Sequence, residues 1–129
     1  MGVKINFITD GDVAGVISVA DPKSKIDIYL GIGGAPEGVL AAAALSCLNC
    51  QMQTRLVFQD DEEKKRARKI GIRELNIKYS INDMVKGDVI FCATGVTNSE
   101  IAKGIIVSSD KFEVNTLALH KSQSLKKKI

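Results

Sequence analysis

The spacing of apolar residues changes several times along this chain, and each change falls at a turn rich in glycine or aspartate. Apolar and polar residues alternate over 3–8 and again over 26–32, which predicts two strands, and helix-like spacing follows each of them. A third strand is predicted over 52–58, followed by a strongly charged helix. This strand–helix–strand order favours a layered α/β fold with strands that begin parallel.

The later part of the chain predicts a mixed ending to that sheet. Residues 88–93 form a nearly continuous apolar run, typical of a strand buried on both faces. Residues 104–119 predict a hairpin that turns at 108–110, and a final strand or basic tail follows. A length of 129 residues suits one domain. We therefore predict a single α/β domain over residues 1–129, with a parallel-to-mixed sheet flanked by helices.

Charge and composition narrow the classes of partner. The net charge of +3 comes largely from basic residues at 64–69 and 126–128, and a solvated face is favoured over a nucleic-acid surface. Aromatic residues make up only 5% of the chain, which argues against base stacking on single strands. No apolar run reaches the roughly 18 residues of a membrane span, and no secretory signal is visible. We expect a cytoplasmic protein that binds neither nucleic acid nor membrane.

Three cysteines and one histidine offer little catalytic chemistry. Cys47 and Cys50 form a C-x-x-C pair, which zinc or redox sites also use, but Cys47 falls on an apolar helix pattern. Buried, inert thiols are the favoured interpretation, and with Cys92 they suit a reducing cytosol. His120 is favoured as a structural or solvated residue, and no Ser–His–Asp or Cys–His set emerges.

Acidic residues occupy two of the predicted strand-to-helix turns. The first turn is Asp10-Gly11-Asp12, in which Asp12 is the expected N-cap of the next helix. The second is the glycine turn, residues 31–38, which carries Glu37 just after a proline suited to a helix start. Parallel strands end at one edge of a sheet, where ligands bind in such folds. The three carboxylates are therefore expected to converge on one crevice.

The glycine turn permits two ligand interpretations. Its first residues resemble the dinucleotide pattern G-x-G-x-x-G, but Pro36 stands where glycine or alanine is needed, which disfavours that interpretation. A divalent cation explains Glu37 better. Helix N-termini attract phosphate, and a carboxylate is tolerated beside it when Mg²⁺ or Mn²⁺ lies between them. Asp10 and Asp12 would then accept hydrogen bonds from sugar hydroxyl groups.

A third turn, residues 93–100, follows the apolar strand. Thr94, Thr97 and Asn98 offer hydroxyl and amide groups to a ligand. Side chains of these types also stabilise loops through local hydrogen bonds. The loop interpretation is favoured over ligand contact.

Several segments together resemble one enzyme family. The segments DGDVAG, YLGIGGAPEGVLAAAAL, MQTRL, NDMVKGDVIFCATGVTNSE and TLAL, in this order, are similar to the C-terminal part of the class II (GlpX-type) fructose-1,6-bisphosphatases. The resemblance implies the fold of the inositol monophosphatase and fructose bisphosphatase group. It also implies a metal-dependent enzyme of gluconeogenesis that hydrolyses the 1-phosphate of fructose 1,6-bisphosphate to give fructose 6-phosphate. Some cyanobacterial members also accept sedoheptulose 1,7-bisphosphate.

The resemblance also implies residue roles. Glu37 matches a ligand of the Mn²⁺ or Mg²⁺ ion, and Asp10, Gly11 and Asp12 match residues that contact the sugar. Gly34 matches a substrate contact in the glycine turn. No catalytic residue is carried over, because family members are about two and a half times as long and the matching positions are absent here.

The absent part sets the remaining expectations. The resemblance implies that this absent part carries most metal-binding carboxylates, the catalytic residues and the basic residues that bind phosphate. We therefore expect this chain alone to be inactive and to bind little metal. A separate N-terminal half is an expected partner, and surfaces that would face it favour a homo-oligomer. The alternative is a non-catalytic sugar-phosphate-binding or assembly module derived from the same fold.

Overall fold

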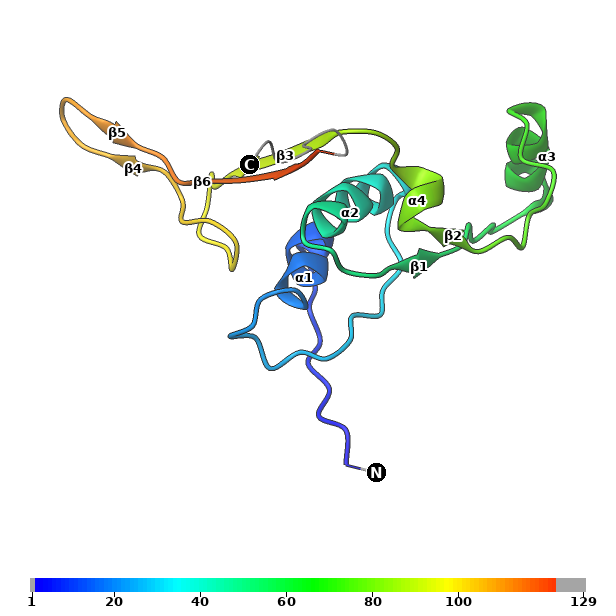
Figure 1. The fold of residues 1–129 in the computed structure, drawn as a ribbon, viewed down its shortest axis with the longest axis horizontal. Helices are drawn as coiled ribbons and strands as arrows, with labels where there is room; N and C mark the ends of the chain where they lie inside the picture. The colour runs from blue at the N-terminus through cyan, green and yellow to red at the C-terminus, as the bar shows by residue number, and fades with distance from the viewer. Residues whose placement is uncertain (1, 123–129) are drawn as a thin grey trace, which may run out of the picture.

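The computed structural model describes residues 2–122, which contain four helices and six short strands (Figure 1). The helices are α1 (Asp12–Ser18), α2 (Ala35–Cys47), α3 (Asp61–Lys69) and α4 (Ile81–Met84). The strands are β1 (Gln53–Thr54), β2 (Tyr79–Ser80), β3 (Val89–Thr94), β4 (Ile106–Val107), β5 (Phe112–Glu113) and β6 (Thr116–Lys121). None of the helices in these residues has the length and apolar character needed to cross a membrane.

Strand pairing in the described residues is antiparallel throughout, in three two-stranded sheets. β3 pairs with β6 from Val89 opposite Lys121 to Thr94 opposite Thr116. β4 and β5 form the predicted hairpin around residues 108–110, and β1 pairs with β2. The α/β class is confirmed, but the parallel-to-mixed sheet predicted from the sequence is not formed within these residues.

Two predicted strands lack partners within the described residues. Residues 3–8 and 26–32 are assigned to no strand. A strand is stable only when its backbone N–H and C=O groups pair with a neighbour. The alternating pattern predicts which side chains share a face, but the pattern cannot supply that neighbour.

β3 differs from its prediction in a related way. Val89 and Phe91 are buried, whereas Ile90 is 74% exposed. The apolar run therefore has one covered face instead of the two that the sequence predicts. Strand β6 lies mostly on residues that the sequence assigns to the hairpin, and only its last two residues belong to the segment 120–129 predicted as a final strand or tail. Residues 123–129 of that segment lie outside the described residues.

Helix α2 organises the small core. Its residues Ala41, Ala42, Ala44 and Leu45 are buried, and it contacts α1, α4, β3 and β6 (Figure 1). Ala44 belongs to a cluster with residues of α1 and β3, and Leu45 to a second cluster with Ile81 of α4. Alanine side chains let neighbouring elements approach the helix axis closely, so one helix can serve both clusters.

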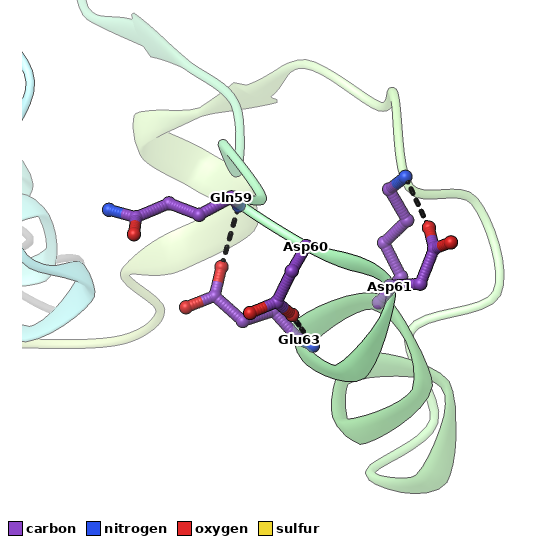
Figure 2. A network of polar contacts seen from close by, with 5 residues as sticks. Gln59, Asp60, Asp61 and Glu63 are labelled. Atoms are coloured by element: carbon purple, nitrogen blue, oxygen red, sulfur yellow. Dashed lines mark hydrogen bonds and ion pairs between the residues drawn. The ribbon is translucent and has the colours of Figure 1, made fainter.

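Helix α3 lies apart from this core and is stabilised by its own polar groups (Figures 1 and 2). The Asp60 carboxylate accepts a hydrogen bond from the Glu63 N–H (2.8 Å), and the Glu63 carboxylate accepts one from the Gln59 N–H (2.8 Å). Lys64 bonds to Asp61 at 2.8 Å, and this contact lowers the pKa of Asp61 below its ordinary value. The helix predicted from acids at its start and bases at its end is therefore confirmed.

The four-residue helix α4 carries the capping pattern that the sequence predicts. The Ser80 hydroxyl donates to the Asp83 carboxylate at 2.6 Å, and the Ser80 N–H donates to it at 2.8 Å. These two hydrogen bonds, the hydroxyl first, hold the pKa of Asp83 below its ordinary value. The cap fixes α4 where Ile81 enters the second core cluster.

Candidate functional site

The first acidic turn is shaped by Gly11, which has a left-handed backbone conformation with φ of 80°. The Asp10 carboxylate accepts the Gly11 N–H at 2.7 Å, and Gly11 is the N-cap of α1. Asp12 is therefore the first helical residue, and the prediction that it caps α1 is wrong. The left-handed conformation, which glycine adopts readily, turns the chain one residue earlier than expected. The Asp12 carboxylate is thus left available for contacts outside its own helix.

Asp12 reaches the segment that precedes the second turn. Its carboxylate accepts a hydrogen bond from the Tyr29 hydroxyl at 3.3 Å. A Cβ atom built on Gly15 would lie 2.9 Å from the Tyr29 ring, so the ring packs closely against α1. Burial first, and then the Asp12 charge and hydrogen bond, raise the pKa of Tyr29 above 10.0. Tyr29 thus links the two turns.

Two adjacent glycines make room for the two carboxylates. A Cβ atom on Gly33 would lie 2.6 Å from the Asp12 carboxylate, and one on Gly34 would overlap the Glu37 carboxylate. Adjacent Cα atoms are about 3.8 Å apart, so the two acids lie against neighbouring residues of one turn. The three carboxylates predicted to converge do so only in part, because Asp12 and Glu37 line one groove and Asp10 does not.

Glu37 lies in the first turn of α2. Gly34 is the N-cap with extended backbone, Pro36 follows, and Glu37 is exposed to solvent. Within residues 2–122 the Glu37 carboxylate has no hydrogen bond or ion pair in the structure. An acid at a helix N-terminus is favoured by the helix dipole, and an unpaired one is free to bind a ligand.

Asp12, Gly34 and Glu37 line one groove of about 740 Å³. Tyr29 lines the same groove, and Arg55 is its one cationic lining side chain within the described part of the chain. Asp10 and Gly11, the other predicted sugar contacts, are exposed and are not among its lining residues. The structure thus brings together three of the five predicted site residues and leaves two at the margin of α1.

Sequence reasoning missed Tyr29 and Arg55. Tyr29 occupies one position of an alternating strand pattern, where an aromatic residue is ordinary. The sequence signal for Tyr29 is its place in the alternating pattern. Ile28 and Leu30 on either side are apolar and point to the opposite face, so the Tyr29 side chain points to the other one. Arg55 lies within the predicted strand 52–58, where a single polar residue carries no distinct signal.

Glu63 also lines the groove, but it is already engaged. One carboxylate oxygen accepts the Gln59 N–H at 2.8 Å, and the other lies 3.7 Å from Arg66 (Figure 2 shows the Gln59 contact). A carboxylate that caps a helix is a poor candidate for a ligand position, since binding elsewhere would break the cap. The acids of α3 therefore support the helix, and Asp12 and Glu37 remain the candidate ligand groups.

The third predicted turn is held by its own side chains. Thr94 and Thr116 hydroxyls lie 2.8 Å apart across β3 and β6, and the Asn98 side chain accepts the Gly104 N–H at 2.9 Å. Backbone atoms of Lys103 would collide with a Cβ atom on Gly95, so this loop folds tightly on itself. These contacts support the loop interpretation over ligand contact.

The thiols follow their predicted pattern only in part. Cys47 and Cys50 are half-buried, and Cys92 is exposed. All three are free. The Cys47 sulfur lies 3.9 Å from the Val89 carbonyl and the Cys50 sulfur 3.6 Å from that of Leu48, which are weak structural contacts. The predicted burial is therefore only partial for Cys47 and Cys50 and is wrong for Cys92, which lies on the exposed face of β3.

The donor set suits part of a metal site. Mg²⁺ and Mn²⁺ prefer oxygen ligands and often use one or two carboxylates beside water and substrate phosphate. Asp12 and Glu37 supply oxygen donors of this kind, and both line the groove. No group of three or more His, Cys, Asp or Glu side chains within residues 2–122 has a metal-binding arrangement.

The fold and groove together define a class: α/β proteins that present carboxylates at a helix N-terminus, beside a glycine turn. The sequence model of one family, "Bacterial fructose-1,6-bisphosphatase, glpX-encoded", matches residues 1–129. The chain belongs to this glpX-encoded bacterial fructose-1,6-bisphosphatase family.

Individual relatives agree with the family. The chain is 37% identical to "Fructose-1,6-bisphosphatase class 2" of Haemophilus influenzae, over 98% of this chain and 42% of the relative. Two Escherichia coli proteins, "Fructose-1,6-bisphosphatase 1 class 2" and "Fructose-1,6-bisphosphatase 2 class 2", are 35% and 33% identical, over 98% and 92% of this chain. The chain spans about two fifths of the length of these relatives (41–42%).

Proposed function

We propose that residues 1–129 are the C-terminal domain of a metal-dependent fructose-1,6-bisphosphatase. The reaction is hydrolysis of the 1-phosphate of fructose 1,6-bisphosphate to give fructose 6-phosphate. One observation carries the proposal, namely that Asp12 and Glu37 lie against adjacent glycines at the N-terminus of α2. Family membership supports the reaction, since the relatives carry its name.

Each residue has a defined part in this proposal. Asp10 and Asp12 accept hydrogen bonds from sugar hydroxyl groups, with Gly11 setting the turn between them. Gly34 contacts the substrate at the start of α2, where backbone N–H groups favour an anion. Glu37 supplies one ligand to Mn²⁺ or Mg²⁺. The bound metal would neutralise phosphate charge and activate water.

The fold proposal extends beyond the described pairing. We propose that residues 3–8 and 26–32 join a parallel-to-mixed sheet of the inositol monophosphatase and fructose bisphosphatase type when the rest of the protein is present. Their alternating apolar residues support this, because strands covered on both faces need such a pattern. The three free thiols suit a cytosolic location.

The chain by itself should lack phosphatase activity. One or two carboxylates hold a divalent cation weakly in water, and phosphoryl transfer needs several ligands and cations. Phosphate release from fructose 1,6-bisphosphate with Mn²⁺ should therefore stay at background. Turnover of the chain alone in the ordinary enzyme range, roughly 1–10³ per second, would contradict this proposal.

Activity should appear when the missing part is supplied. The chain is co-expressed with the part of the Haemophilus influenzae relative that lies outside the match, and phosphate release is measured. Glu37→Gln should lower the activity roughly a hundredfold or more, since even residues that only support a metal ligand cost about 10–100-fold. Glu62→Gln, an exposed acid on α3, is the matched control and should leave activity unchanged. Equal activity of the two variants would remove Glu37 from the metal site.

A non-catalytic sugar-phosphate-binding or assembly module is the second candidate. Both candidates accommodate the lack of a three-ligand cluster within residues 2–122, since the enzyme would take its other ligands from the part of the relatives outside the match. Calorimetry of the co-expressed complex distinguishes the two candidates. Mn²⁺ binding that Glu37→Gln weakens supports the enzyme, and sugar phosphate binding without any metal dependence supports the module.

A further inference from the structure

The side chain of Tyr29 lies between two glycines. A Cβ atom on Gly15 would lie 2.9 Å from one edge of the ring. A Cβ atom on Gly31 would lie 2.9 Å from the opposite edge and 2.6 Å from the hydroxyl oxygen. Real Cβ atoms do not approach other heavy atoms so closely, so a larger residue at either position would displace the ring. The two glycines therefore determine where the ring lies and where its hydroxyl group points.

The hydroxyl group of Tyr29 contacts only one of the two oxygens of Asp12. It donates a hydrogen bond to Oδ1 at 3.3 Å. The other oxygen, Oδ2, is the atom that a Cβ atom on Gly33 would approach to 2.6 Å. Within residues 2–122, Oδ2 accepts no hydrogen bond and forms no ion pair. One oxygen of Asp12 is thus held by Tyr29, and the other lies at the glycine turn and is available to a ligand.

The two acids of the groove differ in this respect. Asp12 and Glu37 both line the groove, as does Tyr29, but within the described part of the chain only Asp12 is held by a neighbouring side chain. A hydrogen bond weakens steeply when its angle departs from linear. An acceptor that is held in one orientation therefore binds a hydroxyl group better than one that must first be ordered. Asp12 meets this requirement through Tyr29.

We propose that Tyr29 is a positioning residue for sugar binding. Its hydroxyl group holds Oδ1 of Asp12, so that Oδ2 accepts a hydrogen bond from a sugar hydroxyl group in the groove. This rests on the proposed function, in which Asp12 contacts the sugar. Tyr29 acts through Asp12, so its contribution to sugar affinity is lost when the Asp12 carboxylate is absent. A tyrosine that only stabilised the fold would change the unfolding temperature and leave sugar affinity unchanged.

Sugar binding by the co-expressed complex tests the proposal. The chain is combined with the part of the Haemophilus influenzae relative outside the match, and calorimetry measures the Kd of fructose 6-phosphate. Tyr29→Phe keeps the ring and removes only the hydroxyl group, so the Kd should rise roughly tenfold. In an Asp12→Ala background, Tyr29→Phe should change the Kd by less than about twofold, because both substitutions act through one carboxylate. An unchanged Kd in Tyr29→Phe, or a rise of similar size in both backgrounds, overturns the proposal.

Gly15→Ala tests the same contact from outside the groove. Gly15 and Asp12 are three residues apart on one face of α1. A methyl group on Gly15 would push the Tyr29 ring away from the helix that carries Asp12. The Kd should therefore rise, and Gly15→Ala should have no further effect in the Tyr29→Phe background. Gly2→Ala is the control, since nothing lies within 4 Å of its Cβ position, and it should leave the Kd unchanged. If Gly15→Ala also leaves the Kd unchanged, Tyr29 does not position Asp12.

Phosphate release separates this inference from the proposed function. In an active complex, Tyr29→Phe should raise the KM for fructose 1,6-bisphosphate roughly tenfold and leave kcat nearly unchanged, as expected for lost substrate binding. An unchanged KM in an active complex overturns the positioning role alone. A complex that binds fructose 6-phosphate in a Tyr29-dependent way but releases no phosphate contradicts the proposed function and leaves this inference standing. A complex that binds no fructose 6-phosphate overturns both.

Discussion

At the scale of single residues, two neighbouring glycines determine where two acids can lie. Gly33 faces the Asp12 carboxylate and Gly34 faces that of Glu37. Any larger residue would push its acid away from the turn, because a Cβ atom would come closer than real contacts allow. Glycine is therefore needed at these two positions because it has no Cβ atom to displace the acids. The backbone itself does not require glycine, since neither residue has a positive φ.

Gly33→Ala should disturb Asp12 and leave the rest of the fold in place. The methyl group would displace the end of the Asp12 side chain, which weakens its hydrogen bond to Tyr29. The pKa of Tyr29 should then move part of the way back toward 10.0, because burial, its largest cause, remains. An ultraviolet titration measures this shift. Gly38→Ala is the control, since nothing lies within 4 Å of its Cβ position, and an equal shift there would contradict the Asp12 contact.

The raised pKa of Tyr29 also predicts a pH dependence of stability. Below about pH 10 the phenol is protonated in both states, so its contribution is fully present. As the pH rises through the folded-state pKa, the unfolded chain loses the proton first, and the free energy of unfolding falls. Urea unfolding from about pH 9 upward should show this decline in the wild-type chain and a smaller one in Tyr29→Phe. Parallel curves for the two proteins would rule out Tyr29 as the cause.

The acids of the candidate site, Asp12 and Glu37, could be predicted from the sequence, whereas the contact of Tyr29 with Asp12 could not. Asp12 and Glu37 each follow an extended segment and begin a helix, so their types and positions point to one edge. Tyr29 reaches Asp12 only because its place in the alternating pattern turns its side chain toward Gly15. That contact depends on how closely α1 approaches the segment, which no local pattern encodes.

At the scale of elements, local signals were sufficient wherever an element is stabilised by its own residues. Helix α3 carries its acids at one end and its bases at the other, and it forms as predicted although it lies away from the core. Segments 3–8 and 26–32 have equally clear strand patterns but remain unpaired. A helix closes its own hydrogen bonds, whereas a strand depends on a second segment.

Removing the N-cap of α3 should destabilise that helix and leave the other elements unchanged. Asp60→Ala removes the acceptor for the Glu63 N–H and should destabilise α3 locally by about 1 kcal/mol. Amide exchange over residues 61–69 should become several-fold faster, and exchange in α2 should not change. Asp60→Asn keeps an acceptor oxygen and is the control. A uniform loss of protection throughout the chain would mean that α3 is coupled to the core.

At the scale of the whole molecule, stability depends on one helix. α2 contributes to both core clusters and contacts elements from both halves of the described chain. Most other large apolar residues are exposed, including those of the two extended segments. Because the core is small, the free energy of unfolding is low, and one cavity in the core can remove a large part of it.

Truncation of one α2 side chain should therefore unfold much of the protein. Leu45 is 4% exposed, and Leu45→Ala should cost roughly 2–5 kcal/mol, a large part of the stability expected of so small a core. Leu40→Ala, on the same helix and 52% exposed, should change stability by only about 0.5 kcal/mol. Thermal unfolding followed by circular dichroism compares the two. Equal effects would show that the buried face of α2 is not the core.

The alanine-rich face of α2 has a consequence for Glu37 at the other end of the same helix. Ordering a buried alanine costs no side-chain entropy, whereas fixing a glutamate costs up to about 2 kcal/mol. The helix that carries Glu37 is thus ordered at a low cost in side-chain entropy, since Leu45 is the one long side chain among its buried residues. When a ligand binds at this position, the side-chain entropy still to be lost is that of the Glu37 torsions alone. The helix axis already sets the direction from which Glu37 reaches the ligand.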